Sequence, residues 1–149
     1  MRADLTRPVP AIPTIACFTE CADATAHIAK GAIVCIGTFD GVHLGHQEIL
    51  KAGRLYADRH SLPLWVVSFH PHPRSVVSSE NTPLLLTLPE ERLALLQHYG
   101  ADGVVLQRFD AELASMSANQ FLNKCILGAL AAKRVVIGSD FALGKGREG

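Results

Sequence analysis

Two histidines three residues apart, His43 and His46, stand in a glycine-rich stretch at the start of a helical pattern. At the first turn of a helix, two imidazoles with this spacing point the same way, beside free backbone N–H groups and the positive end of the helix dipole. Imidazoles can donate hydrogen bonds to phosphoryl oxygens, and Gly41 and Gly45 allow a ligand to approach the backbone closely. The stretch therefore predicts a phosphate-binding site. The alternative for each histidine taken alone is that His43 caps the turn and His46 is an ordinary surface residue.

A second polar group, His70-Pro71-His72-Pro73-Arg74, follows the apolar run Leu64–Phe69. Proline lacks an N–H group and disfavours helix in the residue before it, so Pro71 and Pro73 should end a strand here. A rigid strand exit is the simpler explanation for the two prolines, whereas Arg74 could reach a phosphate. The four histidines of the two groups could also bind Zn²⁺, but phosphate binding explains the pattern without a metal site.

The elements that must position these groups can be read from apolar runs and helical spacing. Unbroken apolar runs typical of buried parallel strands occur at Ala32–Ile36, Leu64–Phe69, Gly103–Leu106 and Val135–Ile137. Apolar residues at helical spacing lie between these runs, at about 45–60, 87–99 and 117–130. This alternation predicts an α/β fold with a doubly wound parallel sheet. In such sheets ligands bind beyond the carboxyl ends of the strands, at the point where strand order switches.

Helix ends have their own signals. Thr87 with Glu90, and Ser117 with Gln120, form capping-box patterns, and Gly100 should end the helix that begins near Thr87. Residues 1–31 are interpreted as a lead-in, with a proline-broken segment and a possible short helix at Ala22–Lys30 closed by glycine.

Composition excludes several classes of protein. The chain has 149 residues, of which 48% are hydrophobic, and this length fits one domain with a sizeable core. Fourteen Lys and Arg balance fourteen Asp and Glu, so we expect neither nucleic acid nor an anionic membrane as a partner. The apolar runs fall short of the ~18 residues of a membrane span, and the acidic start with its prolines does not fit a secretory signal. We therefore expect a cytoplasmic protein.

The chain has four cysteines and no C-x-x-C pair. This pattern suggests neither a disulfide framework nor a thiol redox motif, so we expect reduced cysteines, with Cys35 and Cys125 as small core residues.

Longer segments resemble a known family. The string Ile36–His46 resembles the His-x-Gly-His signature of the nucleotidyltransferase superfamily, in the form found in prokaryotic FAD synthetase. Ser68–Arg74 resembles that family's Phe-x-Pro-His-Pro segment, and Phe109–Phe121 resembles the approach to its third helix. Val136–Gly146 resembles its Gly-x-Asp/Asn-Phe-x-Phe-Gly segment, with Leu143 in place of an aromatic residue. The order of the four segments identifies residues 32–149 as resembling an FMN adenylyltransferase domain with a Rossmann-like fold.

The resemblance implies that the adenylyl group of ATP is transferred to FMN, with pyrophosphate released and Mg²⁺ accompanying ATP. It implies small-molecule substrates and assigns no protein residue to a metal. By this resemblance, His43 and His46 would be the catalytic residues that hold the triphosphate and stabilise the transition state. The ATP-binding residues would be Gly37, Thr38, Phe39, Asp40, His43, Gly45, His46 and Asp140. The flavin side would be formed by His70, Pro71, His72, Pro73 and Arg74, and a loop with Lys145 and Arg147 would cover phosphates.

Some alternatives stay open. Asp40 could instead serve an Asx turn, and Lys145 and Arg147 could belong to a solvated cationic loop. Family members continue into a Ser-Ser-Thr-x-x-Arg segment and a riboflavin kinase domain, which the printed sequence lacks, so we expect a C-terminally incomplete domain with slow or absent turnover. The other candidates are a noncatalytic nucleotide or flavin binder and another His-x-Gly-His transferase, such as a cytidylyltransferase or a pantetheine-phosphate adenylyltransferase. The Phe-x-Pro-His-Pro segment argues against another transferase.

Overall fold

Five parallel strands form one sheet in the order β1-β4-β3-β2-β5 in the computed structural model, which describes residues 15–77 and 84–139. The strands are β1 (Ala16–Phe18), β2 (Ala32–Ile36), β3 (Leu64–His70), β4 (Gly103–Arg108) and β5 (Ala132–Val136). Every strand pair is parallel. The predicted α/β fold with a parallel sheet is confirmed. Along the chain, β3 and β4 extend the sheet on one side of β2 and β5 returns to its other side, so strand order switches at β2.

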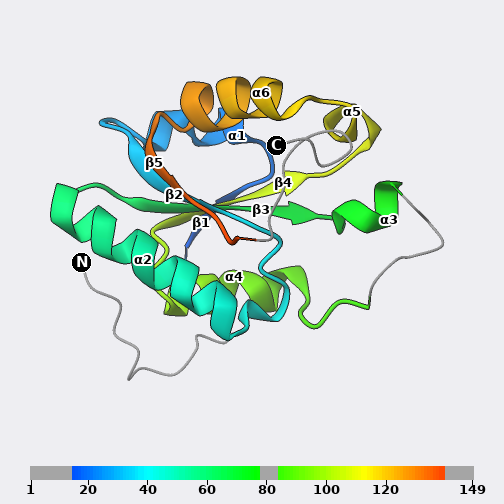
Figure 1. Ribbon diagram of the computed structural model, residues 1–149, viewed down its shortest axis with the longest axis horizontal. Coiled ribbons are helices and arrows are strands. Elements are labelled where there is room, and N and C mark those ends of the chain that lie inside the picture. Colours follow the sequence, from blue (N-terminus) through cyan, green and yellow to red (C-terminus); the bar gives the residue numbers. More distant parts are fainter. Residues whose placement is uncertain (1–14, 78–83, 140–149) are drawn as a thin grey trace.

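Helices cover both faces of the sheet, as Figure 1 shows. On one face lie α2 (Leu44–His60) and α4 (Pro89–His98). On the other lie α1 (Cys21–Ala24), α6 (Ala118–Phe121) and its continuation η4 (Leu122–Ala129), a segment with π-type hydrogen bonding. The shorter elements are η1 (Thr25–His27), η2 (Asp40–Val42), α3 (Pro73–Val77) and α5 (Ala111–Ala114). No helix within residues 15–77 or 84–139 has the length and hydropathy that a membrane-spanning helix needs.

Two cores follow from the alternation of side chains along the strands. In β2 all five residues are buried, with Val34 and Ile36 facing one core and Ile33 and Cys35 the other. The second core also receives Leu50 from α2, which explains the unbroken apolar character of β2: neither of its faces meets water.

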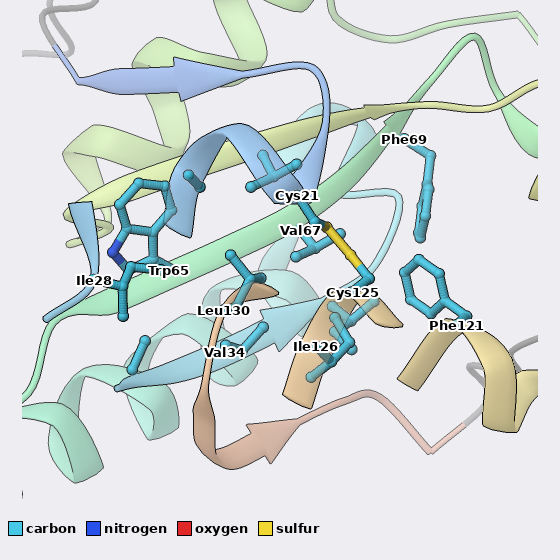
Figure 2. Packing of buried hydrophobic residues seen from close by; sticks show 14 residues of the cluster. Cys21, Ile28, Val34, Trp65, Val67, Phe69, Phe121, Cys125, Ile126 and Leu130 are labelled. Carbon is cyan, nitrogen blue, oxygen red and sulfur yellow. A yellow bond between two sulfur atoms is a disulfide. The ribbon is translucent and has the colours of Figure 1, made fainter. Parts of the chain in front are cut away.

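The core under α1 and η4 contains a disulfide between Cys21 and Cys125, drawn in yellow among the aromatic and aliphatic side chains of Figure 2. This corrects the expectation that all four cysteines are reduced. The two residues are 104 positions apart in sequence, and their pairing depends on α1 and η4 packing side by side. Cys35 is buried as expected, and burial raises the pKa of its thiol to about 12.

Other local expectations need correction. The segment interpreted as a lead-in contributes β1, which pairs with β4. Its predicted short helix is a single turn, α1, followed by the 3-10 turn η1, and ends at His27 instead of Lys30. The predicted capping box at Thr87 and Glu90 is wrong: the N-cap of α4 is Leu88, whose N–H donates to Glu91 Oε2 at 2.9 Å but whose side chain has no acceptor, so only half of a box is present. The hydroxyl of Thr87 is bonded to another loop instead. The box at Ser117 and Gln120 is confirmed, with both reciprocal hydrogen bonds present.

Candidate functional site

The loop after β2, residues 37–46, lies at the switch point and is called the phosphate turn below. Phe39, Gly41 and Val42 all have positive φ, at 52°, 76° and 42°. Only glycine adopts such a conformation without strain, and a Cβ on Gly41 would lie 2.9 Å from Leu86 Cδ1. The turn is therefore tightly folded, and it carries the chain from a buried strand into the N-terminus of α2.

His43 is the N-cap residue of α2. Its Nδ1 accepts hydrogen bonds from the backbone N–H groups of Gly45 at 3.1 Å and His46 at 3.4 Å. An accepting Nδ1 carries no proton, so the neutral ring of His43 has its proton on Nε2 and can donate it outward. The predicted cap and the predicted phosphate donor are thus compatible roles of one exposed side chain.

His46 stacks on His43. The ring centroids are 3.6 Å apart with planes at 22°, and the ring of Phe39 also packs against His46, with centroids 5.1 Å apart. A Cβ on Gly45 would lie 3.0 Å from His43 Cε1, so glycine at this position leaves room for the stack. Two imidazoles held this closely can bind the same anion. Phe39 is fully buried, so its side chain would not contact a ligand directly but supports His46.

Asp40 points toward the segment that precedes α4. Its carboxylate accepts hydrogen bonds from Leu86 N, from Thr87 N and from Thr87 Oγ1, at 2.8–3.1 Å. Burial alone would raise the pKa of Asp40, but these hydrogen bonds and the charge of Arg92 outweigh burial and lower it. Asp40 thus fastens the phosphate turn to a loop 47 residues away in sequence.

The segment after β3, residues 70–74, is called the β3 exit. It includes a cis peptide bond between His70 and Pro71, and Pro73 begins α3. His72 Nδ1 accepts from Arg74 N at 3.1 Å. Burial and the charges of Arg74 and Arg92 lower the pKa of His72, against an opposing influence of Asp40. Because β2 and β3 are neighbours, the β3 exit and the phosphate turn share one edge of the sheet.

Sequence reasoning missed Arg92 of α4. Its side chain is 2% exposed and contacts both β3 and Asp40. A signal was present, since Arg92 lies four residues before the buried Leu96 and thus on the apolar face of the helix.

The predicted site residues divide into those that the structure brings together and those that it does not describe. Gly37, Thr38 and Gly45 lie in the phosphate turn with the two histidines, whereas Asp140, Lys145 and Arg147 fall outside the described residues. In residues 15–77 and 84–139, no three His, Cys, Asp or Glu side chains gather as a metal site would require. A cavity of about 170 Å³ opens near the carboxyl ends of β1 and β4, beside Glu20 and Arg108, but no described site residue lines it.

Comparisons with known proteins point to one family. A family model described as FAD synthetase matches residues 25–149. The bifunctional riboflavin kinase/FMN adenylyltransferase of Escherichia coli (strain K12) is 35% identical over 120 residues, covering 80% of this chain and 38% of the relative. The protein of the same description from Bacillus subtilis (strain 168) is 35% identical over 115 residues, or 76% of this chain and 36% of the relative. The chain thus spans less than two fifths of the length of these curated relatives.

A solved structure shares the fold. The crystal structure of a macrolide-efflux protein from Streptococcus pneumoniae matches with a TM-score of 0.75 and 27% identity, covering 89% of this chain and 43% of that chain.

Proposed function

Because this chain belongs to the FAD synthetase family, we propose that it transfers the adenylyl group of ATP to FMN and thereby forms FAD and pyrophosphate. The observation that supports this proposal is the stacked His43–His46 pair at the N-terminus of α2, at the switch point of the sheet. Helix N-termini and imidazole donors both favour bound phosphate.

In the proposed reaction an FMN phosphate oxygen attacks the α-phosphorus of ATP, and the bond from that phosphorus to the pyrophosphate oxygen breaks. No covalent bond to the protein is needed. His43 would donate from Nε2 to the triphosphate, and His46 would stabilise the negative charge that develops on the phosphate oxygens. The backbone N–H groups of Gly45 and His46 are already bonded to His43 Nδ1, so the side chains provide the contacts to the ligand.

Mg²⁺ is proposed to enter with ATP, where it would neutralise charge on the phosphate oxygens. Mg²⁺ is commonly held by substrate phosphates and water rather than by a full set of protein ligands. The described residues fit that mode, because the carboxylate oxygens of Asp40 in the phosphate turn already accept from Leu86 and Thr87.

The β3 exit is proposed to form the flavin side of the site. Arg74 is exposed and could bind the FMN phosphate, while His72 and Pro73 are half-buried and would form a wall. Because positive and negative side chains are balanced and the substrates are small molecules, we propose a cytoplasmic reaction without a nucleic acid or membrane partner.

The proposal can be tested by titration calorimetry of the 149-residue chain with ATP, GTP and CTP in the presence of Mg²⁺. We expect ATP to bind more tightly than GTP and CTP. FAD formation from ATP and FMN would be followed in parallel by chromatography. Equal affinity for the three nucleotides would contradict the adenylyl assignment. ATP binding without FAD formation, both in this chain and in a version extended by the family's Ser-Ser-Thr-x-x-Arg segment, would identify a noncatalytic binder.

A further inference from the structure

Arg92 is a buried charge in a helix that carries none of the predicted site residues. Its Nη1 donates to Ser68 Oγ at 3.1 Å and to the carbonyl oxygen of Phe69 at 3.0 Å, and its Nη2 lies 4.0 Å from Asp40 Oδ1. One guanidinium therefore contacts the end of β3 and the phosphate turn at the same time.

These contacts continue into both sides of the phosphate turn. Ser68 Oγ donates to the carbonyl oxygen of Thr38 at 2.7 Å, and Asp40 accepts from Thr87 N and Oγ1 at 2.9 and 2.8 Å. Thr87 Oγ1 in turn accepts from Gly41 N at 3.2 Å. We call Thr38, Asp40, Ser68, Thr87 and Arg92 the Arg92 network. The network holds the phosphate turn by hydrogen bonds at Thr38 and at Asp40, the residues on either side of Phe39. His46 packs on Phe39.

The network also reaches the β3 exit. Phe69, whose carbonyl oxygen accepts from Arg92, directly precedes His70. The pKa of His72 responds to the charges of Arg92 and Asp40, which means that all three groups lie within electrostatic reach of one another. One side chain thus contacts the turn proposed to hold ATP and the end of the strand that leads directly into the segment proposed to hold FMN.

Burial of a guanidinium is costly, and apolar side chains of similar volume often stabilise a protein as well as a buried ion pair does. Burial lowers the pKa of Arg92, while the nearby carboxylate of Asp40 opposes this change. Stability alone is therefore a weak reason for a charge at this position. Adenylyl transfer supplies a stronger one, because a displacement of about 1 Å between reacting groups can reduce a rate about 10²-fold.

We propose that Arg92 is a positioning residue, which fixes the phosphate turn relative to the β3 exit so that the two substrates meet in line. This inference rests on the proposed function. It assigns Arg92 no contact with either substrate, since its side chain is 2% exposed.

The test compares Arg92→Met with Arg54→Met, a matched loss of another buried arginine on the same layer of helices. ATP and FMN affinities are measured separately by calorimetry, and FAD formation is measured in single turnover with protein in excess. We expect Arg92→Met to lower the transfer rate about 10-fold or more while each affinity changes less than about 3-fold. Arg92→Lys should recover part of the rate. Arg54→Met should leave the rate of the folded protein unchanged.

A measurement that needs no ligand accompanies these assays. Amide and imidazole NMR signals of Gly41 and His46 should shift in Arg92→Met and stay in place in Arg54→Met. If Arg92→Met does not fold, Ser68→Ala takes its place. This variant removes the hydrogen bonds of Ser68 Oγ to Thr38 and Arg92 and should shift the same signals.

The outcomes separate the two proposals. If the unmodified chain neither binds ATP nor forms FAD, the proposed function fails, whatever the variants do. If the unmodified chain is active and Arg92→Met or Ser68→Ala lowers only the melting temperature, or both affinities together with the rate, Arg92 is merely structural. Unchanged Gly41 and His46 signals in Arg92→Met and Ser68→Ala would overturn the positioning role even without turnover.

Discussion

The amino ends and the carboxyl ends of the parallel strands form two edges of the sheet, called the amino edge and the carboxyl edge. A buried arginine from the same layer of helices lies at each edge, but the two arginines are paired very differently. At the amino edge, Arg54 of α2 donates to Asp102 Oδ2 and to the carbonyl oxygen of Gly100, both at 2.8 Å, and to Asp58 Oδ1 at 3.1 Å. Asp102 also accepts from Leu64 N at 2.8 Å, so the Arg54–Asp102 ion pair links α2 to the first residues of β3 and β4.

At the carboxyl edge, the carboxylate that pairs with Arg92 among the described residues is Asp40, and that contact is 4.0 Å long. Its hydrogen bonds go to Ser68 Oγ and a main-chain carbonyl, and Asp40 uses its oxygens mainly for Leu86 and Thr87. The guanidinium of Arg92 therefore contacts several separate segments and, in the described part of the chain, has no close ion pair.

This difference in pairing suggests different roles for the two arginines. Strong direct pairing of Arg54 contributes to stability where no ligand is expected, because the amino ends of parallel strands are not where such folds bind ligands. Indirect pairing of Arg92 orders loops at the edge that carries His43 and His46. We therefore expect substitutions at the amino edge mainly to lower the free energy of unfolding, and substitutions at the carboxyl edge mainly to lower activity.

Among the substitutions that test this contrast, we expect the largest effect on activity from His46→Ala. His46→Ala should lower the rate of FAD formation by about 10²–10³-fold, since removal of one transition-state donor typically costs about 2.7–4 kcal/mol. His43→Asn should lower it similarly while keeping a side-chain N-cap on α2. Rates at saturating ATP, FMN and Mg²⁺ would be measured beside melting curves. His60→Ala, at the exposed end of α2, is the control. Unchanged rates with a lower melting temperature would make both histidines structural.

Arg54→Met should have the largest effect on folding. Removing this guanidinium breaks its ion pairs with Asp58 and Asp102, and we expect a loss of about 3 kcal/mol, at the low end for a buried pair because both carboxylates are partly exposed. Urea denaturation measures the loss, and calorimetry should show ATP affinity unchanged at low temperature. A weaker ATP affinity in the folded variant would break the proposed division between the edges.

Thr87→Val should have an intermediate effect, spread over both properties. The substitution removes the hydroxyl that donates to Asp40 and accepts from Gly41 N, which takes one of several hydrogen bonds from the carboxylate and the acceptor from the half-buried N–H of Gly41, at a cost of about 1–2 kcal/mol. Thr25→Val is the matched control, since its hydroxyl makes one exposed hydrogen bond, to Ala129 O, on the opposite face. We expect only Thr87→Val to weaken ATP binding. Equal effects of the two variants would show that the hydroxyl of Thr87 does not support the phosphate turn.

The smallest effect concerns pH. The pKa of His72 is lowered in the folded chain, so between the unfolded value of about 6.5 and the lower folded value the unfolded state binds more protons. Stability should therefore fall as pH falls through this range, and His72→Gln should reduce that dependence. Denaturation series from neutral to mildly acidic pH would measure it. An identical pH dependence in His72→Gln would show that the folded environment of His72 does not alter its protonation.

Much of the fold could be predicted from local sequence. Strands β2 and β3 are apolar runs because both faces are covered, and α2 follows from its spacing of apolar residues. The phosphate turn was equally visible, since two histidines separated by three residues at a helix start are a local feature. β1 was missed because three residues of edge strand, mostly exposed, produce no apolar run.

The alternation of strands and helices from β2 to β5 and the histidine pair at the start of α2 could be predicted from the sequence, because each depends on residues a few positions apart. Only the tertiary structure decided which distant groups meet: Cys21 with Cys125, Thr87 with Asp40, and Arg92 with Ser68. The physical reason is that hydrophobic periodicity determines which face of an element is buried but leaves its polar partners open. Thr87 reads locally as a helix cap, yet its hydroxyl bonds Asp40, 47 residues earlier, because packing α4 against the sheet brings that carboxylate within 2.8 Å.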